Sequence, residues 1–185
     1  MKMKHFFGKP DGGEWRVTAQ TVLCGEAIAH MPYIATSYDA PLHPPGWRFS
    51  GVSSHLRYTT NDERGRLNQN PGILGRAAAT CAALIPIRKN EAWWSMAQDE
   101  RRAIYARSVH LEIGLDYLPE IARQLFHSRD AGEPFDFLTW FEFPPEATGR
   151  FDDLVGRLRA TEEWQYVDRE IDIRLTRINE EEAEE

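Results

Sequence analysis

The spacing of hydrophobic residues changes along the chain and predicts where strands and helices lie. Residues 15–23 (WRVTAQTVL) are rich in β-branched and aromatic side chains, which favours a strand, and residues 47–60 return to similar composition. Residues 25–30 favour a short helix. Four prolines and a glycine within residues 32–46 predict a long loop, and residues 61–72 predict a polar connection. The first half is therefore expected to hold strands joined by irregular chain.

The second half has clearer periods. Its predicted elements are a strand over residues 82–89, a helix over 95–114, strands over 121–126 and 135–143, a helix from 151 to 163 and a strand over 166–178. Ser95 and Gln98 have the spacing of a capping box, and Gly114 is a natural helix end. In the second predicted strand, Arg123 is expected on the inward face. The order βαββαβ is typical of a ferredoxin-like unit, with helices on one face of an antiparallel sheet, and predicts an α+β protein.

Composition excludes several classes of function. The chain has 185 residues with 42% hydrophobic and 28% charged positions, as expected for a globular protein. Its net charge is −7, of which five charges belong to the acidic tail at residues 179–185, so the body is almost neutral and nucleic acid is not an expected partner. Residues 1–8 lack the apolar stretch of a secretory signal, and no run approaches the roughly 20 apolar residues of a membrane span. Cys24 and Cys81 suit buried thiols in a reducing compartment, which favours a cytoplasmic location without membrane association.

Common catalytic motifs are absent from the sequence: it has no phosphate-binding glycine loop, no serine elbow and no zinc-type histidine pair. Two polar residues nevertheless lie in apolar surroundings, His110 and Arg123. A buried arginine needs an anion, which could be a ligand or a carboxylate such as Glu120 or Glu142. On the pattern alone, His110 could instead be a core histidine with its hydrogen bonds satisfied, and Arg123 could extend its charged end to solvent. His127 is interpreted as a surface residue at a strand end.

Several blocks of the sequence, in matching order and separation, resemble the haem-containing chlorite dismutases, especially their short-chain, dimeric branch. The blocks are residues 83–89 (ALIPIRK), Trp93 and Trp94, residues 98–102 (QDERR), His110, residues 117–125 (YLPEIARQL), residues 132–142 (GEPFDFLTWFE) and residues 159–164 (RATEEW). The resemblance is strong over about residues 80–178 and weaker around Tyr58.

The resemblance implies a ferredoxin-like dimeric α+β barrel built from two halves. Residues 1–80 would form a trimmed N-terminal half, residues 81–178 a complete C-terminal βαββαβ half that binds haem b, and residues 179–185 an acidic tail. The expected assembly is a homodimer. The expected reaction converts chlorite to chloride and dioxygen through ferryl haem and transient hypochlorite.

The resemblance also implies roles for individual residues. His110 would be the proximal iron ligand, Glu163 would accept a hydrogen bond from its other ring nitrogen, and Arg123 would be the catalytic distal arginine. The remaining residues implied at the cofactor are Lys89, Trp93 and Tyr58 around the haem and its propionates, and Thr139 and Phe141 in the distal lining. A carboxylate on the second imidazole nitrogen would fix its tautomer, and a permanent cation would hold an oxyanion.

Two other functions, and a plain barrel without a cofactor, remain open at this point. A coproheme decarboxylase would share the fold and the proximal histidine but typically replaces the distal arginine, so Arg123 argues against it. A haem carrier or sensor would use the same pocket without turnover. The physiological substrate, the role of residues 32–46 and the role of Asn70 in the polar connection, where it could approach the distal side, do not follow from the sequence.

Overall fold

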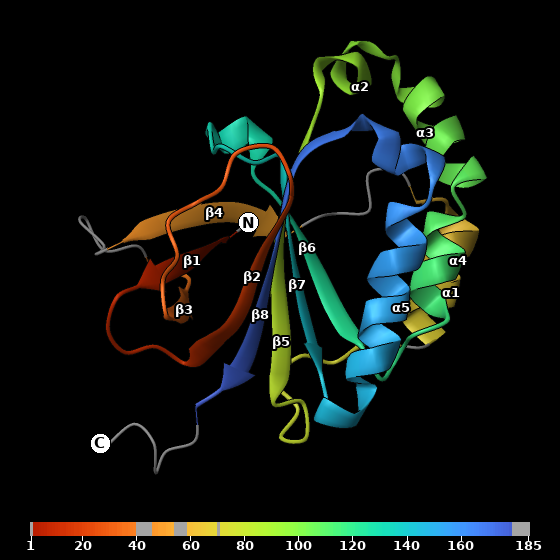
Figure 1. Cartoon of the computed structure of the whole chain (residues 1–185). Helices are drawn as coiled ribbons and strands as arrows, with labels where there is room; N and C mark the ends of the chain where they lie inside the picture. The colour runs from red at the N-terminus through yellow and green to blue at the C-terminus, as the bar shows by residue number, and fades with distance from the viewer. Residues whose placement is uncertain (1, 40–45, 54–58, 70, 179–185) are drawn as a thin grey trace.

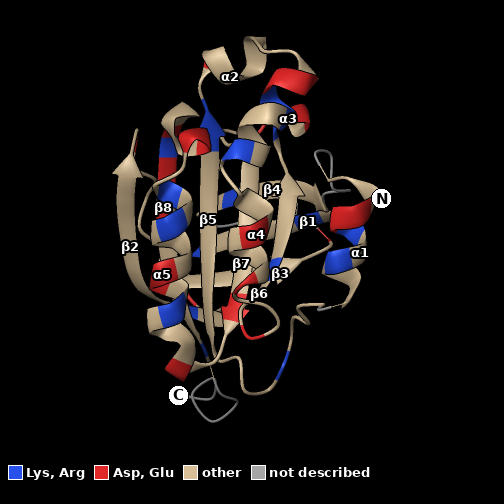
Figure 2. Cartoon of the chain, turned by 90° about the vertical axis from the view of Figure 1, so that its right-hand side faces the viewer, with Lys and Arg blue, Asp and Glu red and all other residues tan. Residues whose placement is uncertain are grey.

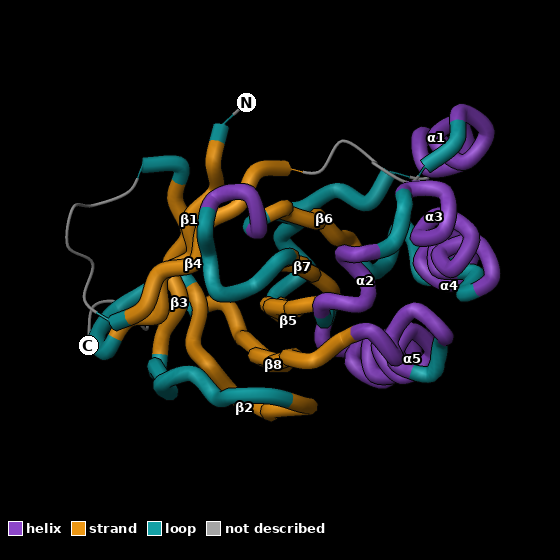
Figure 3. The backbone as a smooth tube through the Cα atoms, turned by 90° about the horizontal axis from the view of Figure 1, so that it is seen from above, coloured by secondary structure: helices purple, strands orange, loops and turns teal. Residues whose placement is uncertain are grey.

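The computed structural model describes residues 2–39, 46–53, 59–69 and 71–178. Within these ranges eight strands form a closed antiparallel barrel, seen from above in Figure 3, in the order β1-β3-β2-β8-β5-β7-β6-β4. The strands are β1 (Met3–Lys9), β2 (Trp15–Cys24), β3 (Tyr33–Ser37), β4 (Trp47–Ser53), β5 (Cys81–Lys89), β6 (Ala122–His127), β7 (Phe137–Phe143) and β8 (Val167–Arg177). The molecule is therefore an α+β protein with a barrel at its centre.

The helices lie together on one side of the barrel, against the strands of the second half (Figure 1). They are α1 (Asn61–Gln69), α2 (Glu91–Ser95), α3 (Gln98–Arg107), α4 (His110–Leu115) and α5 (Thr148–Arg159), with short 3₁₀ turns η1 (Arg129–Ala131), η2 (Pro145–Ala147) and η3 (Glu162–Tyr166). Figure 2, which looks onto the helical side, shows residues of both charges along α1, α3 and α5. Among the described residues, no helix has the length and apolar content that crossing a membrane requires.

Two hydrophobic clusters share the strands of the second half. In β5, Leu84 packs inside the barrel, whereas Ile85 packs against the helices. In β7, Trp140 faces the barrel interior, and Phe141 packs on Phe151 of α5 with ring centroids 5.0 Å apart. A sheet that is buried on both faces needs apolar residues at successive positions, which explains the nearly continuous apolar run of β5.

The prediction of the second half is largely confirmed. Its strands and the amphipathic helix α5 occur at the expected places and in the expected βαββαβ order, although α5 ends at Arg159 rather than at Glu163. The expected single helix over residues 95–114 is wrong, because the chain forms α3 and α4 with a break between them. Ser95 ends α2 instead of capping the next helix. The residue directly before α3 is Ala97, whose backbone N–H donates to the Glu100 carboxylate at 2.7 Å.

Three predictions for the first half are wrong. Residues 25–30 form no helix. The expected loop over residues 32–46 contains β3, which pairs with both β1 and β2, so tertiary pairing outweighs the prolines on either side. The polar connection contains α1, which starts at a genuine capping box: Glu63 N–H donates to the Thr60 hydroxyl at 3.3 Å, and Thr60 N–H donates to the Glu63 carboxylate at 2.7 Å.

Candidate active site

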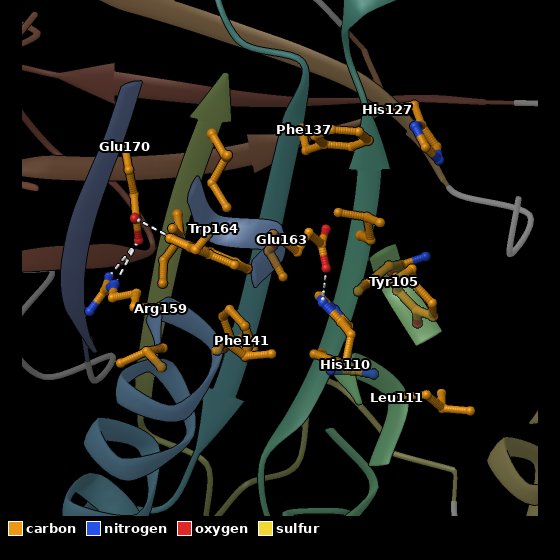
Figure 4. Close-up of a pocket in the computed structure, with 18 of the residues that line it drawn as sticks. Tyr105, His110, Leu111, His127, Phe137, Phe141, Arg159, Glu163, Trp164 and Glu170 are labelled. Atoms are coloured by element: carbon orange, nitrogen blue, oxygen red, sulfur yellow. Dashed lines mark hydrogen bonds and ion pairs between the residues drawn. The ribbon is translucent and has the colours of Figure 1, made fainter. Parts of the chain in front are cut away.

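A cavity of about 380 Å³ lies between the helices and the outer face of the sheet. Strands β5, β6 and β7 contribute most of its sheet side, and α2, α3, α4, α5 and η3 contribute most of its other walls. Figure 4 shows the residues around it, with His110 and Glu163 joined near the centre. Aliphatic and aromatic side chains form most of the lining, among them Ile85, Ile87, Phe141 and Val155. A mainly apolar pocket with a few polar groups suits a bound cofactor.

His110 enters this cavity as the first residue of α4, and its ring is fixed by Glu163. The imidazole Nδ1 lies 2.8 Å from one Glu163 oxygen, and the Lys89 ammonium donates to the other oxygen at 2.7 Å. Burial alone would raise the pKa of Glu163, but the charges and hydrogen bonds of His110 and Lys89 lower it to about 2. Lys89 also lies over the Trp93 ring, 3.7 Å from its centroid. An ionised carboxylate on Nδ1 leaves Nε2 as the nitrogen available for a metal.

The break before α4 determines where His110 points. Val109 has φ 45° and ψ 35°, the left-handed conformation, so the chain turns between α3 and α4 and starts a new helix at His110. A β-branched residue is strained in this region by about 1–2 kcal/mol. The strain is offset by the contacts that hold both helices in place.

Replacing Val109 by glycine should relieve this strain and stabilise the protein by about 1 kcal/mol, which corresponds to a rise of roughly 3 °C in Tm. Val109 is exposed, so little packing is lost. The matched control is Val22→Gly in β2, another exposed valine but in extended conformation, which should lower Tm. Thermal unfolding followed by circular dichroism measures both changes, and a lower Tm for Val109→Gly would contradict the assignment of strain.

Two aromatic rings flank the imidazole. Tyr105 stacks on His110 with ring centroids 4.8 Å apart. Trp164 lies on the other side of the His110–Glu163 pair (Figure 4), and its ring centroid is 6.4 Å from that of His110. The Trp164 indole N–H donates to Glu170 at 2.8 Å, and Arg159 donates to the same carboxylate at 2.8 Å. Stacking and hydrogen bonding together restrict rotation of the imidazole.

Arg123 reaches the same cavity from β6, on the sheet side. In the part of the chain that the structure describes, no carboxylate forms an ion pair with it: Glu120 pairs with Arg150 at 2.7 Å, and Glu142 accepts from Trp140 at 2.9 Å. The prediction that Glu120 or Glu142 could pair with Arg123 is therefore wrong. Burial lowers the pKa of Arg123, with only a smaller opposing effect of Tyr105. A guanidinium without a counter-ion beside an apolar cavity is a binding site for an anion.

Most residues singled out in the sequence meet at this cavity. The structure brings together His110, Arg123, Lys89, Trp93, Glu163, Thr139 and Phe141 on its walls. Tyr58 and Asn70 lie outside the described residues. Arg123 was expected on the inward face of its strand. In β6 this face lines the cavity, whereas Phe126 on the opposite face packs in the barrel interior.

Some lining residues were not found from the sequence. His127, interpreted as a surface residue, lies on the cavity wall and contacts Phe137 with centroids 5.2 Å apart. Tyr105 and Trp164 were also missed, although Trp164 directly follows Glu163. Their positions depend on the helix break and on the turn η3, neither of which has a periodic signal.

Comparison with known proteins identifies the family. The model of the family described as "Chlorite dismutase" matches residues 37–178. The chain belongs to the chlorite dismutase family. A dimeric chlorite dismutase from Nitrobacter winogradskyi has a crystal structure that is similar with a TM-score of 0.88 and 52% identity, over 95% of this chain and 99% of that chain.

More distant chlorite dismutases are longer. A mutant chlorite dismutase from Candidatus Nitrospira defluvii matches with a TM-score of 0.63 and 27% identity, over 75% of this chain and 58% of that chain. A chlorite dismutase from Ideonella dechloratans is 29% identical over 120 residues, which is 63% of this chain but 40% of the relative's length. The chain therefore spans well under two thirds of that relative.

Proposed function

We propose that this protein is a haem b chlorite dismutase that converts chlorite to chloride and dioxygen. The observation that carries the proposal is that His110 of α4 and Arg123 of β6 line the same mainly apolar cavity. Among the described residues, no carboxylate is bound to Arg123. Family membership and the similarity to a dimeric chlorite dismutase support it.

The residues present fit haem b, the cofactor on which the family depends. Trp93 lines the cavity, yet its indole N–H is buried without a partner among the described residues, as expected of a donor that awaits a cofactor carboxylate. Lys89 would add a positive charge there, and His110 would hold the iron through Nε2. Iron porphyrin supplies the oxygen-atom chemistry that no side chain can perform.

The side chains of this chain would bind and orient the reactants. Arg123 offers a permanent charge and a planar fork of donors that match a small oxyanion. The apolar lining excludes water and strengthens that interaction. Glu163 keeps the His110 proton on Nδ1. The reaction consumes no net proton, so a cation that holds the anion suffices.

We further propose that the chain contains two ferredoxin-like halves, residues 1–80 and 81–178, and forms a homodimer in the cytoplasm. Each half contributes its four strands in the same order, fourth, first, third, second: β4-β1-β3-β2 and β8-β5-β7-β6. In the second half, α2, α3 and α4 connect β5 to β6, and α5 connects β7 to β8; the described part of the first half has no helix between the corresponding strands. The dimeric relative from Nitrobacter winogradskyi supports the assembly, and the two free cysteines support a reducing compartment.

The test is to load the protein with haem b, add chlorite and follow dioxygen with an oxygen electrode. The expected result is one dioxygen and one chloride per chlorite. A stoichiometric haem complex that releases no dioxygen at any pH would point to a carrier or sensor. Haem b formed from iron coproporphyrin and peroxide, detected by mass spectrometry, would point to a decarboxylase instead.

A further inference from the structure

A buried serine joins the turn between α3 and α4 to the backbone of Glu163. Ser108 directly follows α3, and its hydroxyl accepts a hydrogen bond from the Glu163 N–H at 3.0 Å. Glu163 is the second residue of η3, so its N–H has no acceptor within that short helix. A buried N–H needs a partner, and the Ser108 hydroxyl is the acceptor that lets this one be buried.

The left-handed turn at Val109 directs the residues on both sides of it to the same partner. Along a continuous α-helix, side chains two residues apart point in directions about 200° apart, so they could not both reach one residue. Here Ser108 binds the Glu163 backbone, and His110 Nδ1 lies 2.8 Å from the Glu163 carboxylate (Figure 4). Glu163 is thus held through its backbone and its side chain from one turn of the chain.

We propose that Ser108 is a positioning residue that holds Glu163 where its carboxylate orients His110; the consequence for haem rests on the function proposed above. The carboxylate extends from the backbone that Ser108 binds, so a shift of this backbone changes the contact between the carboxylate and the imidazole. Ser108 lies outside the lining of the cavity, and Glu163 contacts Nδ1 rather than Nε2, which would bind the iron. Binding of haem therefore does not require either contact to move.

The end of helix α3 does not by itself explain the serine. The Ser108 hydroxyl reaches η3, 55 positions further along the chain, whereas the hydroxyl of Ser95 at the end of α2 donates to the Glu91 carbonyl of its own helix at 2.9 Å. Beside Ser108, Arg107 and Glu162 form an ion pair on the surface at 2.8 Å. Exposed pairs of this kind contribute little, so the buried hydrogen bond is the contact expected to fix the Glu163 backbone.

Ser108→Ala should remove the acceptor and keep the fold. Ser108 has φ −73° and ψ −5°, which alanine adopts without strain. The Glu163 N–H would lose its partner, and a carboxylate that is less well aligned with Nδ1 makes the imidazole a weaker donor to iron. We expect haem affinity to fall roughly three- to tenfold, the range of one neutral hydrogen bond. The iron–imidazole stretching frequency should fall and the ferric/ferrous reduction potential should rise.

The experiment compares Ser108→Ala, the matched control Ser95→Ala, Glu163→Gln and the double variant Ser108→Ala/Glu163→Gln. Crystal structures of the apoproteins give the distance from the Glu163 carboxylate to His110 Nδ1, which should lengthen in Ser108→Ala and stay near 2.8 Å in Ser95→Ala. In haem-loaded protein, resonance Raman spectra give the stretching frequency, and a redox titration gives the potential. Both should change in Ser108→Ala and not in Ser95→Ala. The double variant should match Glu163→Gln, because the serine acts only through the glutamate.

Two results would overturn the proposal. An unchanged distance with an unchanged stretching frequency in Ser108→Ala, even at a lower Tm, would show that Ser108 only stabilises the fold. A further change when Ser108→Ala is added to Glu163→Gln would show that it acts by another route. If Ser108→Ala does not fold, Ser108→Cys keeps a similar volume with a weak acceptor and is judged by the same distance and spectrum. Failure of the wild-type protein to release dioxygen from chlorite would reject the proposed function, while the apoprotein distances would still decide the role of Ser108.

Discussion

His110→Ala is expected to lower the affinity for haem b at least a hundredfold. The imidazole is the group that would bind the iron, and even an outer partner such as its carboxylate typically contributes a factor of 10 to 100. The ring is held by Glu163 at 2.8 Å and stacked on Tyr105, so the alanine variant loses a preorganised ligand. Titration of the apoprotein with haem, followed by absorption in the Soret region, gives the affinity.

Imidazole added to His110→Ala should restore part of the haem affinity, because the deletion leaves room for it beside Glu163. The matched control is His127→Ala, which removes the other described histidine on the cavity wall. This variant should bind haem like the wild type. Equal haem affinity in His110→Ala and the wild type would remove His110 as the iron ligand.

Arg123→Ala is expected to retain haem and to lose dioxygen release by a factor of about 10 to 100 in kcat/KM. Hydrogen bonds to charged groups contribute roughly 1.5–3 kcal/mol, which corresponds to this range. Arg123 has no carboxylate partner in the described part of the chain, so its removal leaves no buried charge unpaired and the fold should persist. An oxygen electrode measures the rate over a range of chlorite concentrations.

Arg123→Lys separates charge from geometry. Lysine keeps the positive charge but lacks the planar fork, so partial activity is expected. Arg66→Ala is the control for loss of an arginine, because Arg66 is half exposed and pairs with Glu112 at 3.3 Å on the helical surface. Wild-type rates in Arg123→Ala would contradict the role of Arg123 in binding the anion.

The two halves of the chain differ in how much their sequence predicts. The strands β5, β7 and β8 and the helix α5 have strong periodic patterns, and each of them occurs at its predicted place, with ends that differ by up to four residues. The helix α1 was missed because it has no buried residue and hence no periodicity, although Thr60 and Glu63 carried its capping signal. The strand β3 was predicted as loop because Pro32 directly precedes it and three further prolines follow within residues 41–45, while its pairing partners β1 and β2 are fixed by barrel closure.

The sequence by itself determined the βαββαβ order of the second half and the residue types that could bind haem, because periodicity and side-chain chemistry are local properties. Only the tertiary structure decided which face of each strand meets the helices and which residues become neighbours. Glu163 reaches His110 across 53 positions, and Lys89 of β5 reaches the same carboxylate across 74 positions. Such contacts arise when the barrel closes and the helices cover one side of it, since packing joins residues that no spacing along the chain relates.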